Sequence, residues 1–328
     1  MTLESFPITL DDVRRAADGL SGVAIRTPLL ENPDVNAKLG GRLLIKAECA
    51  QRTGAFKIRG AYWRLQNMTD DERSRGAITY SSGNHAQGVS RAAQIVGTSA
   101  LIVMPEDVEK SKKDATLALG AEIATFNRDT ENQEDVVARL QSETGRINVP
   151  PSADHYILAG GGTVALEIFQ QAKRLDAQPD AILTPCGGGG LTAATAMVAK
   201  DLGSSAEIYA VEPVLFDDTR RSLEAGSLVA NPTGQRTICD AIMTRIPFEQ
   251  TYNINKQLLA GVLVASDDEV RAAMRFAFEN YKIVVEPGAA VGIAAILNGR
   301  IDIKDRIIAT VVTGGNIDPD RFCKLVNL

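Results

Sequence analysis

The sequence predicts an α/β fold with mainly parallel sheets. Short apolar runs rich in β-branched residues alternate with helical patterns along most of the chain, as parallel strands joined by crossover helices require. Glycine-rich turns at residues 83, 187–190 and 314–315 each follow one of these apolar runs. Because ligands bind beyond the carboxyl ends of parallel strands, we expect the three turns to border a binding cleft.

The expected strands are short and are bounded by Gly, Pro or polar residues. They comprise residues 42–48, 76–82, 100–105, 122–127, 180–185, 207–213 and 306–315. Helices are expected between them at residues 84–97, 112–120, 163–175 and 191–203. Three of these four helices end at a Gly, the residue that most often follows a helix C-terminus.

Composition excludes several classes of protein. The chain has 328 residues, enough for two domains, and its 45% hydrophobic and 23% charged content is typical of soluble globular proteins. The net charge of -6, without a basic run, argues against a nucleic-acid partner. No apolar run is long enough to span a membrane, and the acidic N-terminus does not resemble a secretory signal. Four widely spaced cysteines predict a reduced, cytoplasmic protein.

The stretch TPCGGGGLTAAT, residues 184–195, runs from an expected strand into an expected helix. Its backbone N–H groups and the helix N-terminus predict a phosphate-binding loop. The absence of a Gly-Lys pair excludes a Walker A loop. Gly188, Gly190 and Ala193 also fit the dinucleotide fingerprint, with Glu212 at the end of the next strand, and Gly160–Gly162–Ala165 gives a second match. From this loop alone, an NAD-dependent dehydrogenase is an alternative.

A second polar turn, SSGNHAQG at residues 81–88, follows the strand that ends near Tyr80 and precedes a helix. Ser81, Ser82, Asn84 and several N–H groups are therefore expected to face one point, as a nest for a carboxylate or phosphate. A helix cap alone would need only one of these side chains.

Eight motifs occur in one order along the chain. They are TGAFKIRGA (53–61), SSGNHAQG (81–88), VMP (103–105), AGGGTVALE (159–167), PCGGGGL (185–191), VEP (211–213), VEPGAA (285–290) and TGGN (313–316). Together, and from TPLL (27–30) onward, they resemble the fold-type II pyridoxal-phosphate enzymes, specifically the threonine/serine dehydratase and serine racemase group, which includes hydroxyaspartate dehydratases. The resemblance implies a two-domain, tryptophan synthase β-like fold, with residues 1–74 and 154–328 forming a large domain and 75–153 an inserted small one.

The resemblance implies that Lys57 forms the Schiff base with the cofactor aldehyde. Its apolar neighbours, Phe56 and Ile58, suit that role, because partial desolvation lowers the pKa of an ammonium group and makes it nucleophilic. The other implied cofactor-binding residues are Phe56 beside the ring, Asn84 at the phenolic oxygen, Gly187, Gly188, Gly189 and Gly190 at the phosphate, Glu286, and Thr313 at the pyridine nitrogen. The implied substrate-binding residues are Ser81, Ser82, Asn84, His85 and Gln87, of which Ser82 is the second catalytic residue in racemases.

The implied activity is a dehydratase (ammonia-lyase) that converts L-threonine or L-serine to a keto acid and ammonia. A β-hydroxyaspartate dehydratase and a serine or aspartate-type racemase share the same motifs and stay open as alternatives. A substrate with a second carboxylate would need a cationic partner in the cleft, and the sequence does not place Arg59, Arg236 or His155 there. The chain ends soon after TGGN, so it resembles the short catabolic enzymes rather than those with a regulatory domain; a homodimer is expected.

The segment EPVLFDD, residues 212–218, predicts a divalent-cation site. Glu212 and Asp218 follow a strand, six residues apart, with Phe216 between them. Hard oxygen ligands of this kind suit Mg²⁺, with Ca²⁺ or Mn²⁺ as alternatives. The resembling family implies the same set: two carboxylates and the backbone carbonyl at Phe216.

Overall fold

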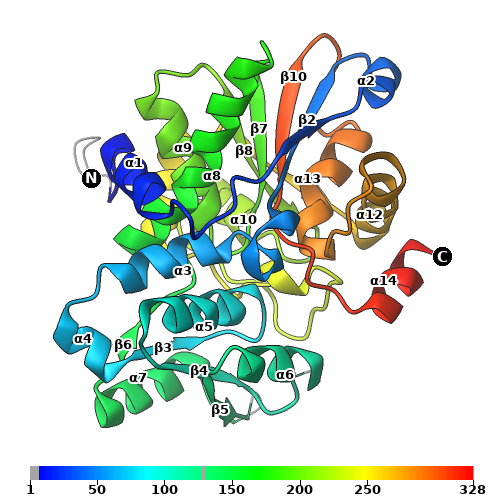
Figure 1. The fold of residues 1–328 in the computed structure, drawn as a ribbon. Coiled ribbons are helices and arrows are strands. Elements are labelled where there is room, and N and C mark those ends of the chain that lie inside the picture. The colour runs from blue at the N-terminus through cyan, green and yellow to red at the C-terminus, as the bar shows by residue number, and fades with distance from the viewer. Residues whose placement is uncertain (1–6, 109, 128–129, 328) are drawn as a thin grey trace.

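The structure is a computed structural model that describes residues 7–108, 110–127 and 130–327. Its strands form two sheets, drawn one above the other in Figure 1. The larger sheet has the strand order β1-β2-β10-β7-β8-β9 and the smaller has the order β5-β4-β3-β6. All neighbouring strands are parallel except the pair β1 and β2. The predicted α/β class with mainly parallel sheets is therefore confirmed.

The ten strands are β1 (Leu29–Glu31), β2 (Arg42–Ala47), β3 (Ala77–Tyr80), β4 (Ala100–Pro105), β5 (Glu122–Phe126), β6 (Ile147–Asn148), β7 (Ala181–Pro185), β8 (Glu207–Pro213), β9 (Gly261–Ala265) and β10 (Ile307–Val312). All seven expected strands are present. The prediction missed β1, β6 and β9. Two of these have only two or three residues, too few to show a pattern.

The helices of the N-terminal half are α1 (Leu10–Gly19), α2 (Pro33–Leu39), η2 (Glu48–Ala50), η3 (Arg52–Gly54), α3 (Lys57–Gln66), α4 (Asp70–Arg75), α5 (Asn84–Val96), α6 (Lys110–Ala118) and α7 (Gln133–Thr144). Those that follow are α8 (His155–Arg174), α9 (Gly190–Asp201), α10 (Asp218–Ala225), η4 (Asp240–Ile242), α11 (Glu249–Leu258), α12 (Asp267–Tyr281), α13 (Pro287–Leu297) and α14 (Pro319–Val326). None in the described part of the chain combines the length and apolar character needed to cross a bilayer.

Helix α8 corrects one expectation. It begins at His155, eight residues before the helix expected at 163–175, so Gly160 and Gly162 lie inside a helix rather than in a loop. A Cβ at Gly160 would lie 2.6 Å from the carbonyl oxygen of Arg59. Glycine at position 160 therefore allows α8 to pack closely against α3. The second match to the dinucleotide fingerprint, at Gly160–Gly162–Ala165, was wrong.

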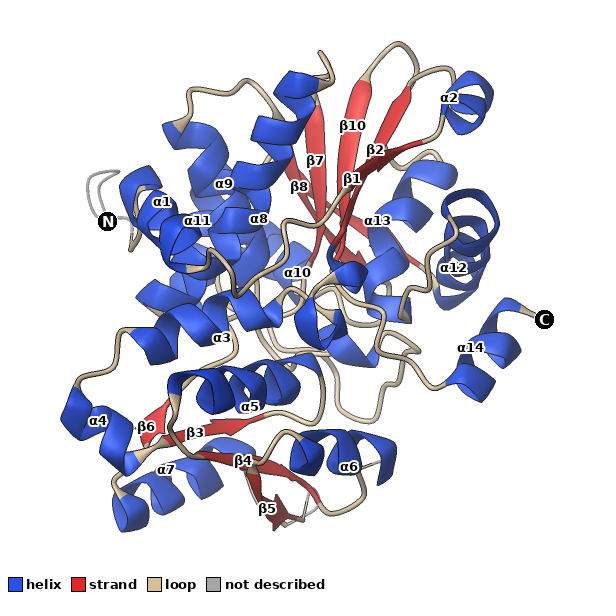
Figure 2. Cartoon of the chain, viewed as in Figure 1, coloured by secondary structure: helices blue, strands red, loops and turns tan. Residues whose placement is uncertain are grey.

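The larger sheet is covered on both faces, as Figure 2 shows. One apolar core lies between the sheet and helices α12 and α13, and the other between the sheet and helices α1, α8 and α9. A third core joins α3 and α5 to the smaller sheet. Helix α3 thus packs against both parts of the molecule, α5 on one side and α8 on the other.

A buried ion cluster fixes α3 in place. The Arg59 side chain is 1% exposed, and its guanidinium donates to Glu48 at 2.8 Å and to Glu167 at 2.8 Å. The Lys46 amine donates to the same Glu167 at 2.6 Å. Each charge has an opposite partner, which buried ions require. Arg59 therefore ties α3 to η2 and α8, and it lies outside the cleft.

The smaller sheet is built from residues 77–148 alone. These residues lie within the predicted inserted domain of residues 75–153. The domain boundaries themselves stay a prediction.

Candidate active site

A cavity of about 460 Å³ is lined by residues from both sheet-containing parts of the molecule. Its walls come from the turns after β3, β7 and β10, which the sequence predicted, together with α6, η4 and the start of α14. Every predicted cofactor and substrate residue lines it, namely Phe56, Lys57, Ser81, Ser82, Asn84, His85, Gln87, Gly187, Gly188, Gly189, Gly190, Glu286 and Thr313. The three predicted metal ligands lie elsewhere.

Lys57 is the first residue of α3, so its side chain leaves the helix at the end that borders the cavity. Its Nζ donates to the backbone carbonyl of Pro151 at 2.7 Å and lies 5.1 Å from the centre of the Phe56 ring. Burial lowers the pKa of Lys57 to about 8. The amine is therefore still mostly protonated at neutral pH, but its unprotonated, nucleophilic fraction is far larger than that of an ordinary lysine.

The glycine loop joins β7 to α9. Gly189 has a φ of 80°, and no side chain among the described residues caps the N-terminus of α9. A Cβ at Gly188 would lie 2.5 Å from the Phe248 ring, and one at Gly190 would lie 3.1 Å from the Cβ of Ser152. The loop therefore needs glycine, and it presents N–H groups at the positive end of a helix, which is a site that fits a phosphate.

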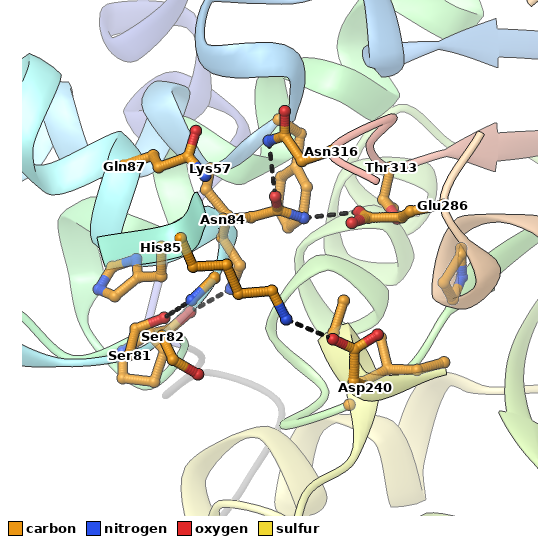
Figure 3. A pocket seen from close by; sticks show the side chains of 18 of the residues that line it. Lys57, Ser81, Ser82, Asn84, His85, Gln87, Asp240, Glu286, Thr313 and Asn316 are labelled. Carbon is orange, nitrogen blue, oxygen red and sulfur yellow. Dashed lines mark hydrogen bonds and ion pairs between the residues drawn. The ribbon is translucent and has the colours of Figure 1, made fainter. Parts of the chain in front are cut away.

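Asn84 is held from both sides of its amide group, as Figure 3 shows. Its Nδ2 donates to Glu286 at 2.6 Å, and its Oδ1 accepts from the Nδ2 of Asn316 at 2.8 Å. Burial raises the pKa of Glu286 to about 7. These contacts join the turn after β3 to the loops before α13 and after β10.

The Ser81–Ser82 turn lies across the pocket from Thr313 and Glu286 (Figure 3). The N–H of Gly83 donates to the hydroxyl oxygen of Ser81 at 3.1 Å, which shapes the turn before α5. Thr313 is 7% exposed, and its carbonyl accepts from the N–H of Phe56 at 3.0 Å. The turn, the buried threonine and the lysine thus converge on one cavity.

His85 is almost completely buried, with 3% of its surface exposed. Burial and the charge of Lys57 lower its pKa to about 3, so the ring is neutral. Its Nε2 lies 2.9 Å from the carbonyl oxygen of Val149 and must donate to it, because a carbonyl only accepts. His85 therefore anchors the start of α5 to the loop after β6.

Glu212, Phe216 and Asp218 lie between the end of β8 and the start of α10, and all three are buried. Burial and the charge of Asp218 raise the pKa of Glu212 to about 8, and burial raises that of Asp218 to about 6. Two carboxylates withheld from water in this way suit a cation, which would neutralise them. No group of three or more His, Cys, Asp or Glu side chains with metal-binding geometry occurs in the described residues.

The same placement counts against the dinucleotide interpretation. Both carboxylate oxygens of Glu212 accept backbone N–H bonds at 3.0 Å, from Thr219 and Arg220. Glu212 does not line the cavity beside the glycine loop, where a ribose would have to bind. The acidic residue of that fingerprint is therefore missing from the site.

Several lining residues were not predicted from the sequence: Lys112, Pro151, Ser152, Asp240, Asn316 and Arg321. Asn316 belongs to the motif TGGN, which the sequence analysis includes without predicting a role for this residue. Lys112, Asp240 and Arg321 come from three separate elements, and no local pattern relates them.

Comparison with known proteins agrees with this geometry. A family model described as pyridoxal-phosphate dependent enzyme matches residues 20–314. The L-threo-3-hydroxyaspartate ammonia-lyase of Saccharomyces cerevisiae is 36% identical, over 97% of this chain and 96% of its own.

Solved structures match equally well. A threonine deaminase from T.th. is 39% identical with a TM-score of 0.89, covering 95% of this chain and 99% of its own. Maize serine racemase is 33% identical with a TM-score of 0.91, covering 97% of each chain. The chain therefore belongs to the pyridoxal-phosphate dependent enzymes of fold-type II.

Proposed function

We propose that this enzyme is a pyridoxal-phosphate dependent ammonia-lyase that converts a β-hydroxy amino acid to a keto acid and ammonia. The observation that carries the proposal is the position of Lys57, whose amine of lowered pKa lies in the same cavity as the Gly187–Gly190 loop. The relatives named above act on 3-hydroxyaspartate, threonine and serine. The candidate substrates are these three amino acids.

The cofactor would be held by groups already in place. The N–H groups of Gly187 to Gly190 would bind its phosphate, Asn84 its phenolic oxygen and Thr313 its ring nitrogen. When bound, pyridoxal phosphate supplies an electron-withdrawing ring that stabilises negative charge at the substrate Cα. The Thr313 hydroxyl is neutral, so it would hold the ring nitrogen without protonating it. An unprotonated ring nitrogen stabilises negative charge at Cα less well, which favours rapid loss of the β-hydroxyl group.

The chain's own residues would bind the substrate and move its protons. The Ser81–Gln87 turn would bind the α-carboxylate through its N–H groups and hydroxyls. The unprotonated amine of Lys57, which lines the same cavity as that turn, would take the proton from Cα. Ser82, on the wall that carries the turn, would return a proton to the other face of Cα if the enzyme racemises its substrate.

The metal, the oligomeric state and the location are parts of the same proposal. Glu212, Asp218 and the Phe216 carbonyl would hold Mg²⁺, Ca²⁺ or Mn²⁺, which would brace the junction of β8 and α10. A homodimer is supported by apolar side chains such as Val214 and Leu215, each 45% exposed.

A cytoplasmic location is supported by free cysteines in the described residues.

The test is reconstitution with pyridoxal phosphate, followed by assay of keto-acid release from L-serine, L-threonine and L-threo-3-hydroxyaspartate. Chiral analysis of serine is run in parallel. Keto acid from at least one substrate is expected. Inversion without keto-acid release would replace the lyase with a racemase, and failure to bind the cofactor would refute the whole proposal.

A further inference from the structure

The side chain of Asn316, in the loop after β10, joins three separate segments at the cavity wall. Its Nδ2 donates to the carbonyl oxygen of Thr53 at 2.7 Å and to the Oδ1 of Asn84 at 2.8 Å. Thr53 lies shortly before α3, whose first residue is Lys57, and Asn84 begins α5. Figure 3 shows the bond from Asn316 to Asn84 and the bond from Asn84 onward to Glu286.

The carbonyl of Thr53 is held in place toward Asn316. Thr53 has a φ of 61°, a backbone conformation that β-branched residues rarely adopt. The N–H of Gly315 donates to the carbonyl of Gly54 at 2.9 Å, so the two loops lie side by side. A Cβ at Gly54 would collide with the Oδ1 of Asn316, and glycine therefore allows the close approach. These contacts fix Asn316 relative to the start of α3.

The Thr53 carbonyl determines the orientation of two amide groups. A carbonyl oxygen only accepts, so the atom of Asn316 that faces Thr53 must be Nδ2. The second N–H of this Nδ2 points at Asn84, and the atom that receives it must be an acceptor, which is Oδ1. The Nδ2 of Asn84 is thereby turned to the other side, where it donates to Glu286 at 2.6 Å.

Glu286 alone does not fix the amide of Asn84. Burial raises the pKa of Glu286 to about 7, so both of its protonation states are populated near neutral pH. The protonated acid is able to donate to an amide oxygen, whereas the carboxylate only accepts. Among the described residues the Nδ2 of Asn84 has Glu286 as its one acceptor. Its second N–H is therefore available to a ligand in the cavity that both residues line.

We propose that Asn316 is a positioning residue for the cofactor: it holds the amide of Asn84 so that an N–H, and not the carbonyl oxygen, faces the phenolic oxygen of pyridoxal phosphate. This inference rests on the proposed function, which assigns that contact to Asn84. A donor stabilises the ionised phenolic oxygen, whereas an amide oxygen repels it. Loss of Asn316 should therefore weaken cofactor binding and reduce the ionised fraction of the bound phenol.

The first experiment replaces Asn316 by leucine, which has nearly the same shape but no donor. The dissociation constant for pyridoxal phosphate should rise about tenfold, as expected for the loss of a hydrogen bond to a charged group. At fixed pH the absorption spectrum of the bound cofactor should shift toward the band of the neutral phenol. An unchanged affinity and spectrum would show that Asn316 only fills space, and would overturn the inference.

Asn36→Leu is the matched control. Asn36, on α2, also uses both ends of its amide, because it donates to Glu31 at 2.8 Å and accepts from the N–H of Leu43 at 2.9 Å. It does not line the cavity. The control should therefore lose stability without any change in cofactor affinity or spectrum. A similar change in both variants would attribute the effect to general destabilisation and would overturn the inference.

The second experiment tests whether Asn316 acts through Asn84. Asn316→Leu is introduced into the Asn84→Ala protein, in which no amide is left to orient. Its effect on the dissociation constant should fall from about tenfold to less than about twofold, because residues that act through one contact are not additive. A full tenfold loss in that background would show that Asn316 only braces the Thr53 turn, and would contradict the proposal. Asn316→Ala admits water to the Thr53 carbonyl and provides the same comparison in case the leucine variant does not fold.

The outcomes separate this inference from the proposed function. An unmodified protein that binds no pyridoxal phosphate would refute both. Normal binding by the unmodified protein, with additive losses from the two substitutions, would refute only the role of Asn316.

Discussion

The amine of Lys57 donates a hydrogen bond to the carbonyl oxygen of Pro151, 2.7 Å away and 94 residues further along the chain. Lys57 begins α3, whereas Pro151 belongs to the loop between β6 and α8. The contact directs the amine into the cavity and gives it a neutral acceptor rather than a carboxylate. Its pKa is therefore lowered by burial without an opposing ion pair.

Lys57→Ala should abolish turnover and leave the fold intact, because the side chain lies at the cavity and only its amine has a polar contact to lose. Borohydride reduction of the holoenzyme should attach the cofactor covalently to Lys57, as peptide mass analysis would show. Lys113→Ala serves as the control and should stay active. Substantial keto-acid release by Lys57→Ala would contradict the assigned role.

Cofactor incorporation should depend on pH through the same amine. The pKa of Lys57 is lowered to about 8, so the amine is protonated below pH 8 and unprotonated above it. The rate at which cofactor-free protein develops the bound chromophore should therefore rise with pH and level off above about pH 8. A rate still rising steeply near pH 10, where an ordinary lysine titrates, would show that the amine is not perturbed.

Gly189→Ala should weaken cofactor binding. At a φ of 80° a Cβ costs about 1–2 kcal/mol, and here it would also lie 2.9 Å from the amide nitrogen of Asn255. We expect the dissociation constant for pyridoxal phosphate to rise about tenfold or more.

Gly203→Ala is the matched control, because Gly203 has a φ of 65° and open space around it. It carries the same backbone strain outside the cavity. If the two variants have similar melting temperatures but only Gly189→Ala binds pyridoxal phosphate more weakly, the loss of affinity arises in the glycine loop. Equal affinities of the two variants would argue against a phosphate site in that loop.

Divalent cations should stabilise the protein through Glu212 and Asp218. A cation present at about 100 times its dissociation constant adds about 2.7 kcal/mol to the free energy of unfolding, so chelation should lower the melting temperature. Asp218→Asn should remove this response to Mg²⁺. Asp217→Asn alters the adjacent carboxylate, which pairs with Arg220 and Arg221, and should keep the response. An unmodified protein indifferent to chelator would refute the site.

Glu48→Gln should destabilise the fold. Glu48 is fully buried and accepts two hydrogen bonds at 2.8 Å from Arg59, and removal of one partner from a buried ion pair costs about 3–5 kcal/mol. Urea unfolding would measure the loss, with the exposed Glu106→Gln as control.

The pH dependence of that loss follows from the charge of Glu48. Burial opposes its ionisation, but Arg59 and other partners hold its pKa below the ordinary value. Its contribution is therefore present above the ordinary glutamate pKa and is lost as the pH falls through the lowered one. The two proteins should differ most near neutral pH and converge in acid.

The sequence by itself determined the fold class and the central part of the site. Strand–helix alternation places the turns after β7 and β10 at adjacent strand ends of the larger sheet, and the turn after β3 at a strand end of the smaller sheet. Local chemistry indicates Lys57, the Ser81–Gln87 turn and the glycine loop as site residues. These features depend on residues adjacent in sequence, where spacing and backbone geometry act directly.

Tertiary structure alone decided which distant groups meet. Nothing local distinguishes Arg59, which is buried in an ion cluster, from Arg321, which lines the cavity. The carbonyl acceptor of Lys57, the pairing of Asn84 with Glu286 and the union of Lys112 with Arg321 through Asp240 all join segments from separate elements. Their distances are set by how helices and sheets pack, and hydrophobic patterning records which face of an element is buried but not which partner lies against it.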